Sequence, residues 1–240
     1  MPMTADELYR AGRVDAAVEL LGAELREHPT DLRRRTFLFE LLCFTGKYDR
    51  AERQLEVLAQ GGKEAQLGTL LYRSALHAER QRQAMFESRG FPTGPAPRPV
   101  SGTLNGQPFS TLEDADPRIG ARLELFAGGA YTWLPFEHIA SLQLQPPQKL
   151  RDLLWAPALV RPAEHFRQLE LGEVLLPVLA PLTWQQADDA IRLGRMTQWQ
   201  ELEDGAQVPV GQKMLLVDDE EFPLLEVREL VITPSPIAEA

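Results

Sequence analysis

The residues that could do chemistry are grouped in two acidic stretches of the second half of the chain. The four carboxylates at 218–221 follow an apolar segment, and carboxylates at the end of a strand can hold a hard cation such as Mg²⁺. A solvated acidic turn between two strands is the alternative, and we favour it because no phosphate-binding glycine loop or histidine lies nearby. Asp188 and Asp189 would point about 100° apart on a helix, so we expect them to be surface charges. The sequence therefore predicts no metal and no cofactor.

The remaining reactive side chains do not form a catalytic set either. The four histidines show no HxxxH or HExxH spacing; they are His28, His77, His138 and His165. Cys43 stands between a leucine and a phenylalanine, where a cysteine is typically a buried apolar residue and not a nucleophile. Since the chain also has no GxSxG, Walker-type or GxGxxG stretch, we expect a protein that is not an enzyme. A metal-dependent enzyme that uses the acidic half is the alternative.

The elements that position these residues begin with a repeat. Four pairs of identical residues are spaced by 34 positions: Leu8 and Leu42, Gly12 and Gly46, Ala17 and Ala51, and Leu21 and Leu55. This period, with a small residue at a turn, is typical of helix-turn-helix repeats of the tetratricopeptide type. Glycine permits the conformation that ends a helix, and alanine lets two helices approach closely. Such units form grooves that bind other proteins.

Hydrophobic periodicity predicts five helices in this region, at 4–11, 15–28, 32–44, 49–58 and about 64–88. Thr4 begins a capping box that is completed by Glu7, and we expect Asp31 and Asp49 to be N-caps. Arg80 stands where a third repeat would place its turn glycine. The last helix therefore continues without a break and closes the stack as a cap.

The first helix of each repeat of this type lines the inner curve, and this resemblance predicts a groove for a partner protein. Its candidate residues are Arg33, Thr36, Glu40, Cys43, Phe44, Leu70, Ser74 and His77. Two and a half repeats would seat one helix or one short peptide. The alternative is a groove that the second half of the same chain fills.

A stretch rich in proline and glycine, GFPTGPAPRPV at 90–100, predicts a stiff linker between two domains. Residues 1–89 form the domain of tetratricopeptide-like helical repeats. Residues 101–240 form a compact, acidic α+β domain with short, mostly antiparallel strands in a partly barrel-like sheet. We expect hairpins at 102–109 and 122–134, further strands at 142–144, 173–180, 214–217 and 224–232, and a helix at 185–193.

Charge and composition exclude several classes of function. The net charge of −10 falls entirely within residues 90–240, because the basic and acidic side chains of residues 1–89 balance. An acidic surface repels phosphate, so we expect neither nucleic acid nor a membrane as a partner. No apolar run has the length of a membrane span, and the first residues lack the order of a signal peptide. With its single cysteine, the chain is expected to be a soluble protein of the cytoplasm.

Longer patterns in the second half resemble one known family. The run GTLNGQPFSTLEDADPRIGARLELFAGGAYTWLPFEHI at 102–139 is similar to the central signature of the ImpE family, also called TagJ or SciE, of type VI secretion clusters. The resemblance continues through 150–160, 176–181, 188–199 and 211–230, and the first helical region is similar too. The stretch 161–170 fits the pattern less well.

The resemblance implies an accessory protein of the contractile type VI secretion machine that acts in the cytoplasm. Members of the family bind the small sheath subunit through an N-terminal helix of that subunit. They also associate with the ClpV-type AAA+ unfoldase, which recycles contracted sheaths. By this resemblance the helical half would take the sheath helix, and the acidic half would meet the unfoldase or stabilise the first half. A rigid scaffold with an occluded groove is a further alternative.

Overall fold

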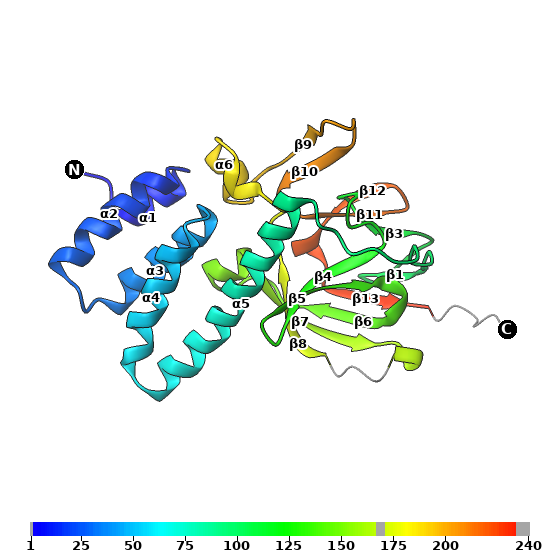
Figure 1. Ribbon diagram of the computed structural model, residues 1–240, viewed down its shortest axis with the longest axis horizontal. Coiled ribbons are helices and arrows are strands. Elements are labelled where there is room, and N and C mark those ends of the chain that lie inside the picture. The colour runs from blue at the N-terminus through cyan, green and yellow to red at the C-terminus, as the bar shows by residue number, and fades with distance from the viewer. Residues whose placement is uncertain (1, 167–170, 234–240) are drawn as a thin grey trace.

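A computed structural model describes residues 2–166 and 171–233, and places helices on one side of the molecule and strands on the other (Figure 1). The first part contains five α-helices and a short 3₁₀-helix, η1: α1 (Ala5–Arg10), α2 (Val14–Glu27), α3 (Leu32–Phe44), α4 (Tyr48–Leu58), η1 (Ala59–Gly61) and α5 (Lys63–Ser88). No helix or strand occurs from residue 89 to residue 101, a stretch that the structure describes completely. The long α5 lies between the other helices and the sheet.

The helical region confirms the expected repeat. All four residue pairs spaced by 34 positions are present at equivalent sites, and their leucines and alanines are buried in one core. Gly12 and Gly46 both have positive φ, at +70° and +66°, as a helix-ending turn requires. The capping box of Thr4 and Glu7 and the N-cap of Asp31 are confirmed.

The prediction that Asp49 is an N-cap is wrong, because Lys47 occupies the cap position of α4 and has no side-chain cap bond. Asp49 lies within the first turn of that helix and forms an ion pair with Arg80, at 2.9 Å. A carboxylate in the first turn is still favoured by the helix dipole. The sequence signal was therefore correct about charge and wrong about position.

The strands form three sheets in which every pairing is antiparallel. The largest has eight strands in the order β2-β1-β13-β6-β7-β8-β4-β5 and keeps two edges, at β2 and β5. The strands are β1 (Gly102–Leu104), β2 (Gln107–Phe109), β3 (Leu112–Asp114), β4 (Arg122–Ala127), β5 (Ala130–Pro135), β6 (Ile139–Leu144), β7 (Trp155–Pro162), β8 (Gly172–Pro177), β9 (Thr197–Glu201), β10 (Gln207–Gly211), β11 (Met214–Val217), β12 (Glu220–Pro223) and β13 (Glu229–Ile232). The expected α+β fold class is confirmed.

Tight turns join the hairpins that the sequence predicts. Asn105 and Gly106 connect β1 and β2 with φ values of +50° and +80°. Positive φ at both central residues defines the turn type whose twist matches a hairpin. Asp218 and Asp219 form a second such turn, between β11 and β12, with φ values of +51° and +68°. The alternative of an acidic turn between two strands thus describes the position of these carboxylates.

Three parts of the second half differ from expectation. The predicted helix at 185–193 is replaced by a 3₁₀-helix, Thr183–Gln185, and a four-residue helix, α6 (Asp189–Arg192). The predicted strand at 224–232 begins with another 3₁₀-helix, Leu224–Glu226, and only its end pairs as β13. The strands β3, β7, β9, β10 and β12 were not expected. Most of β9 is exposed, so it lacks the apolar alternation by which strands are recognised.

The helices and the sheet share a hydrophobic core. A cluster of buried residues around the helices includes Phe126, Trp155, Leu175 and Leu193 from the second half of the chain. A second cluster fills the space between the strands and is formed by residues of the second half together with Val100. Because the first cluster draws on both halves, folding of the helices buries part of the sheet region. The division into domains at 1–89, 90–100 and 101–240 stays a proposal.

Gly46 offers a test of how closely the two halves pack. A Cβ atom added to it would lie 2.4 Å from Trp184, whereas one added to Gly12 would come no closer than 3.9 Å to Arg195. Both glycines have the left-handed conformation, so alanine costs about 1 kcal/mol at either site. We expect Gly46→Ala to lose a further ~1–3 kcal/mol of unfolding free energy by overpacking.

Urea denaturation of the two alanine variants measures this difference, with Gly12→Ala as the matched control. Equal losses would mean that Trp184 does not press on the turn at Gly46.

Candidate protein-binding site

The structure separates the eight residues of the predicted groove into two groups. Glu40, Cys43 and Phe44 are buried in α3. The other five remain wholly or partly accessible: Arg33 and Thr36 near the start of α3, and Leu70, Ser74 and His77 on α5. The eight residues therefore do not share one open surface.

The buried group lies against the second half of the chain. Cys43 and Phe44 line a cavity of about 20 Å³ together with Leu154, Trp155 and Trp184. This is about the volume of one water molecule, so the inner face of α3 has no room for a partner peptide. Burial raises the pKa of the Cys43 thiol well above its usual value, which disfavours the nucleophilic thiolate.

Glu40 is held by a cation from the second half. Arg151 donates from Nη1 to Glu40 Oε1 at 3.2 Å, and its guanidinium lies 4.6 Å from the ring centre of Tyr72. Burial raises the pKa of Glu40 to about 7, although the charge of Arg151 acts in the opposite direction. Glu40 is thus an interface residue whose charged form is only partly compensated.

The pKa of Glu40 predicts a pH dependence of stability. Between the unfolded value of 4.5 and the folded value of about 7, the folded protein binds more protons than the unfolded chain. Stability therefore falls as the pH rises through this window. Glu40→Gln removes this titration. As the pH rises from about 5 to about 8, we expect the free energy of unfolding of the variant to increase by about 1–3 kcal/mol relative to that of the unmodified chain.

Urea denaturation at the two pH values measures this gain. Glu64→Gln changes an exposed glutamate of α5 and is the matched control. A parallel pH response of the unmodified chain and the Glu40 variant would contradict the prediction.

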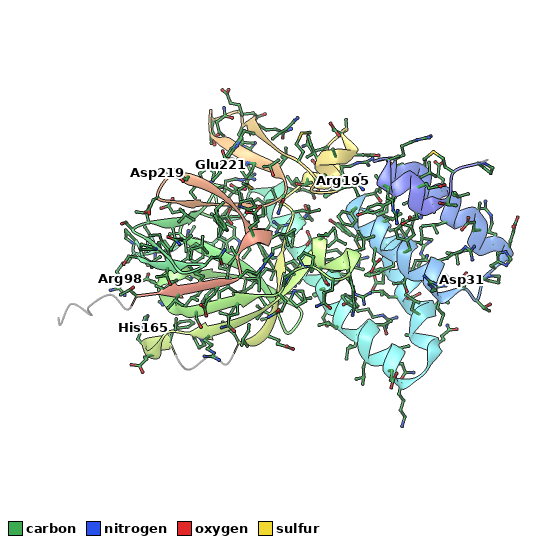
Figure 2. The ribbon with its side chains drawn as sticks, turned by 180° about the vertical axis from the view of Figure 1, so that it is seen from behind. Asp31, Arg98, His165, Arg195, Asp219 and Glu221 are labelled. Carbon is green, nitrogen blue, oxygen red and sulfur yellow. The ribbon has the colours of Figure 1, made fainter. Side chains whose placement is uncertain are left out.

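A short segment of the second half caps two helices of the first half. The backbone N–H of Val14, at the start of α2, donates to Asp189 Oδ2 at 2.8 Å. Arg195 donates to the carbonyl oxygens of Arg10 and Tyr9, at 2.9 Å and 2.7 Å, at the end of α1. A carboxylate at a helix N-terminus and a guanidinium at a C-terminus both complement the helix dipole. Figure 2 shows Arg195 between α6 and the first helices.

These contacts correct the expectation that Asp189 is a surface charge, whereas Asp188 is exposed as expected. Asp188 caps α6 by accepting from the N–H of Ala190 at 2.7 Å. Asp189 contacts α2 and also pairs with Arg192, which reaches Asp15 at 2.7 Å. Asp189 is therefore part of the interface between the two halves.

Beneath α5 lies a group of buried ionic residues that was not predicted from the sequence. We call Arg82, Asp114, Glu124 and Lys213 the Glu124 cluster; all four are at most 2% exposed. Arg82 donates to both carboxylate oxygens of Glu124, at 2.8 Å and 3.0 Å, and Lys213 pairs with both Glu124 and Asp114. The only sequence signal was a glutamate between two leucines in a predicted strand.

The electrostatics of the Glu124 cluster are unequal. Burial by itself would raise the pKa of Glu124, but Arg82 and Lys213 outweigh it and lower this pKa to about 2. Burial raises the pKa of Asp114 to about 7 despite Lys213 at 2.5 Å. Glu124 is thus the anion that the two cations require.

The accessible part of α5 presents large apolar side chains. Leu67, Leu70 and Leu71 are 71%, 62% and 51% exposed, respectively. Leu67 and Leu70 line a hollow of about 570 Å³ together with Arg73. Arg73 also lines the neighbouring hollow, with Ser74 and His77. The structure thus brings Leu70, Ser74 and His77 together on one accessible face of α5.

The acidic turn is occupied by contacts within the chain. Asp218 Oδ1 accepts from the N–H groups of Ser110 and Thr111, both at 2.8 Å. Glu221 accepts from the indole N–H of Trp199 at 3.1 Å. Figure 2 shows Asp219 and Glu221 at the far side of the sheet from Asp31. Within residues 2–166 and 171–233 no three histidine, cysteine or acidic side chains are placed to hold a metal ion.

Two of the four histidines meet, although their sequence spacing gave no sign of it. His138 Nδ1 and His165 Nε2 are 3.1 Å apart, and the ring of His138 stacks on Phe166. His28 is the C-cap of α2, and His77 contacts Gln81. His165 lies at the opposite end of the sheet from Asp219 and Glu221, so the paired histidines and the acidic turn do not form one centre (Figure 2).

The fold is that of an α+β protein in which tetratricopeptide-like helices pack on an antiparallel sheet. A sequence profile described as "ImpE protein" matches residues 106–231. TagJ of Pseudomonas aeruginosa PAO1, described as a type VI secretion system accessory component, is 33% identical over 270 aligned positions, which cover 97% of this chain and 92% of TagJ. The chain belongs to the ImpE family.

A solved structure has the same fold. The crystal structure of protein VPA1032 from Vibrio parahaemolyticus matches with a TM-score of 0.84 at 21% identity, over 98% of this chain and 99% of that one. Separately, none of the helices among the described residues has the length and hydrophobicity of a membrane span.

Proposed function

We propose that this chain is a non-enzymatic accessory component of a type VI secretion system, acting in the cytoplasm. The observation that carries the proposal is the sequence identity of 33% with TagJ, a type VI secretion system accessory component, over nearly the full length of both chains. The match extends through the helical region as well as the sheet. Both halves are therefore expected to contribute to the shared role.

The proposed partners are a helix of the small sheath subunit and the ClpV-type AAA+ unfoldase. Exposed leucines on α5 support a helical partner, because large apolar side chains in a hollow are what an amphipathic helix buries. The acidic second half supports a protein partner over nucleic acid or a membrane surface.

Two alternatives have different support. A rigid scaffold is favoured by the packing of Trp155 and Trp184 over the inner face of α3, which leaves that face closed. The metal-dependent enzyme has less support, because Asp218 and Glu221 already accept hydrogen bonds from backbone and indole groups. The accessible face of α5 favours an adaptor, because a pure scaffold needs no exposed apolar surface for a partner.

A binding experiment with two forms of the small sheath subunit tests the proposal. The complete subunit is expected to bind the purified chain, and a form that lacks its N-terminal helix is not. Size-exclusion chromatography and calorimetry provide the measurement. Equal behaviour of the two forms, whether both bind or neither does, would refute the proposed partner. Co-elution with the unfoldase tests the second partner separately.

A further inference from the structure

One face of α5 extends beyond the sheet, and no helix or strand among the described residues covers it. Lys63, Leu67, Leu70, Ser74 and His77 follow one another at intervals of four, three, four and three residues, which places them on one side of an α-helix. At the C-terminal end this side meets the sheet, where Gln81 accepts from the N–H of Tyr131 at 3.2 Å. Towards the N-terminus it carries the two most exposed large apolar side chains among the described residues.

This face is hollowed along its length. One hollow, of about 570 Å³, is lined by Leu67, Leu70 and Arg73, and the next, of about 500 Å³, by Arg73, His77 and the turn 128–130. We call these two hollows together the α5 groove. From Lys63 to His77 the groove is about 21 Å long, which is the length of a helix of about 14 residues. The turn at 128–130 forms its end wall.

The charges of the α5 groove have one sign. Lys63 and Arg73 line it, and neither forms an ion pair with another of the described residues. His77 lines its second hollow. The lining of both hollows, all of it in described residues, contains no acidic side chain. A ligand that places carboxylates beside its apolar stripe would therefore be favoured in this groove. The excess negative charge of the chain lies in its second half and not in the lining of the groove.

We propose that the α5 groove binds one amphipathic helix of about 14 residues, with an apolar stripe towards Leu67 and Leu70 and carboxylates beside Lys63 and Arg73. A helix satisfies its own backbone hydrogen bonds. An extended strand would find no partner on α5, whose backbone groups are already used within the helix. The proposal deepens the proposed function and rests on it for the biological partner.

Two designed helical peptides of about 14 residues test the chemistry without the natural partner. Both carry the same leucine stripe, and one has glutamates and the other lysines along its flank. Fluorescence anisotropy with the full chain is expected to show binding of the glutamate peptide, at least about tenfold tighter than that of the lysine peptide. Absence of binding by either peptide, or preference for lysine, would overturn the proposal.

Variants of the chain locate the binding. Leu67→Ala combined with Leu70→Ala keeps residues of high helix propensity and is expected to weaken the glutamate peptide at least about tenfold. Val231→Ala, on an exposed position of β13, is the matched control and is expected to change nothing. Circular dichroism confirms that each variant is folded. Unchanged affinity of the folded double variant would place the peptide elsewhere and overturn the proposal.

The two proposals fail in different ways. If the designed peptide binds the groove but the sheath subunit does not bind the chain, the groove stands and the proposed partner is wrong. If the sheath subunit binds the double variant as tightly as the unmodified chain, the proposed function stands and the groove is not its site.

Discussion

Replacing Glu124 by glutamine is expected to lower the free energy of unfolding by about 3–5 kcal/mol. The carboxylate is fully buried and accepts two hydrogen bonds from Arg82, at 2.8 Å and 3.0 Å, while also pairing with Lys213. Glutamine has nearly the same shape but no charge. Of the carboxylates in contact with the two buried cations, Lys213 would then keep Asp114 and Arg82 would keep Glu79. Urea denaturation near neutral pH measures the loss.

The pH dependence of the loss identifies its cause. The pKa of Glu124 is lowered to about 2 in the folded protein, from 4.5 in the unfolded chain. Its stabilising contribution is therefore complete above about pH 4.5 and is lost as the pH falls from there through about 2. The gap between the unmodified chain and Glu124→Gln is expected to narrow over this window. A gap that stays constant would indicate that shape, and not charge, explains the loss.

A charge-neutral pair of substitutions supplies the control. Arg82→Met combined with Glu124→Leu removes one cation and one anion and leaves Lys213 paired with Asp114. Apolar replacement of a complete buried ion pair is often tolerated, so the double variant should be more stable than the sum of the single losses predicts, by more than about 1 kcal/mol. Strict additivity would contradict the coupling inferred from the geometry.

Local signals in the sequence predicted the elements that depend on local chemistry. The turns at Gly12 and Gly46, the cap at Asp31 and the Asn105-Gly106 hairpin all need particular residues at fixed offsets. Their prediction required no knowledge of the rest of the molecule. The family was predicted for a different reason, because the resemblance covered almost the whole chain.

The elements that the sequence misplaced serve distant parts of the fold. The expected helix at 185–193 does not form as one element. Trp184, directly before it, packs on Gly46, and Asp189, within it, accepts a hydrogen bond from the start of α2. These contacts join residues more than a hundred positions apart, and tertiary contacts of this kind override local propensity. The hydrogen bond from Arg82 to Glu124 also joins two separate elements, α5 and β4, so local sequence patterns do not predict it.

The candidate site shows the same division. The resemblance to tetratricopeptide repeats placed Glu40, Cys43 and Phe44 on the inner face of α3, and all three side chains are buried. Whether such a face binds another protein or the chain's own second half depends on docking, which the repeat pattern does not encode. A Cβ atom added to the turn glycine of either repeat would meet the segment 184–195, at Arg195 for Gly12 and at Trp184 for Gly46. The repeat therefore positions its turns for contacts within the chain.

Phe44→Ala is the second substitution with a large expected effect, a loss of about 3–5 kcal/mol of unfolding free energy. The ring is only 1% exposed and packs in the core that the helices share with Trp155. Truncation removes its apolar burial and leaves a cavity that the rigid helices around it close only in part. Leu70→Ala, at a side chain that is 62% exposed, should change stability by less than about 0.5 kcal/mol.

The contrast between these two residues separates the interface within the chain from the surface available to partners. If Phe44 were part of an open groove, its truncation would weaken partner binding and leave urea denaturation almost unchanged, as expected for Leu70. The structure instead buries Phe44 in the core, where it supports the fold, and exposes Leu70, where a partner can reach it. Loss of binding by Phe44→Ala would then follow from unfolding, and only Leu70→Ala would report on contact. Equal stability losses for the two variants would contradict this assignment.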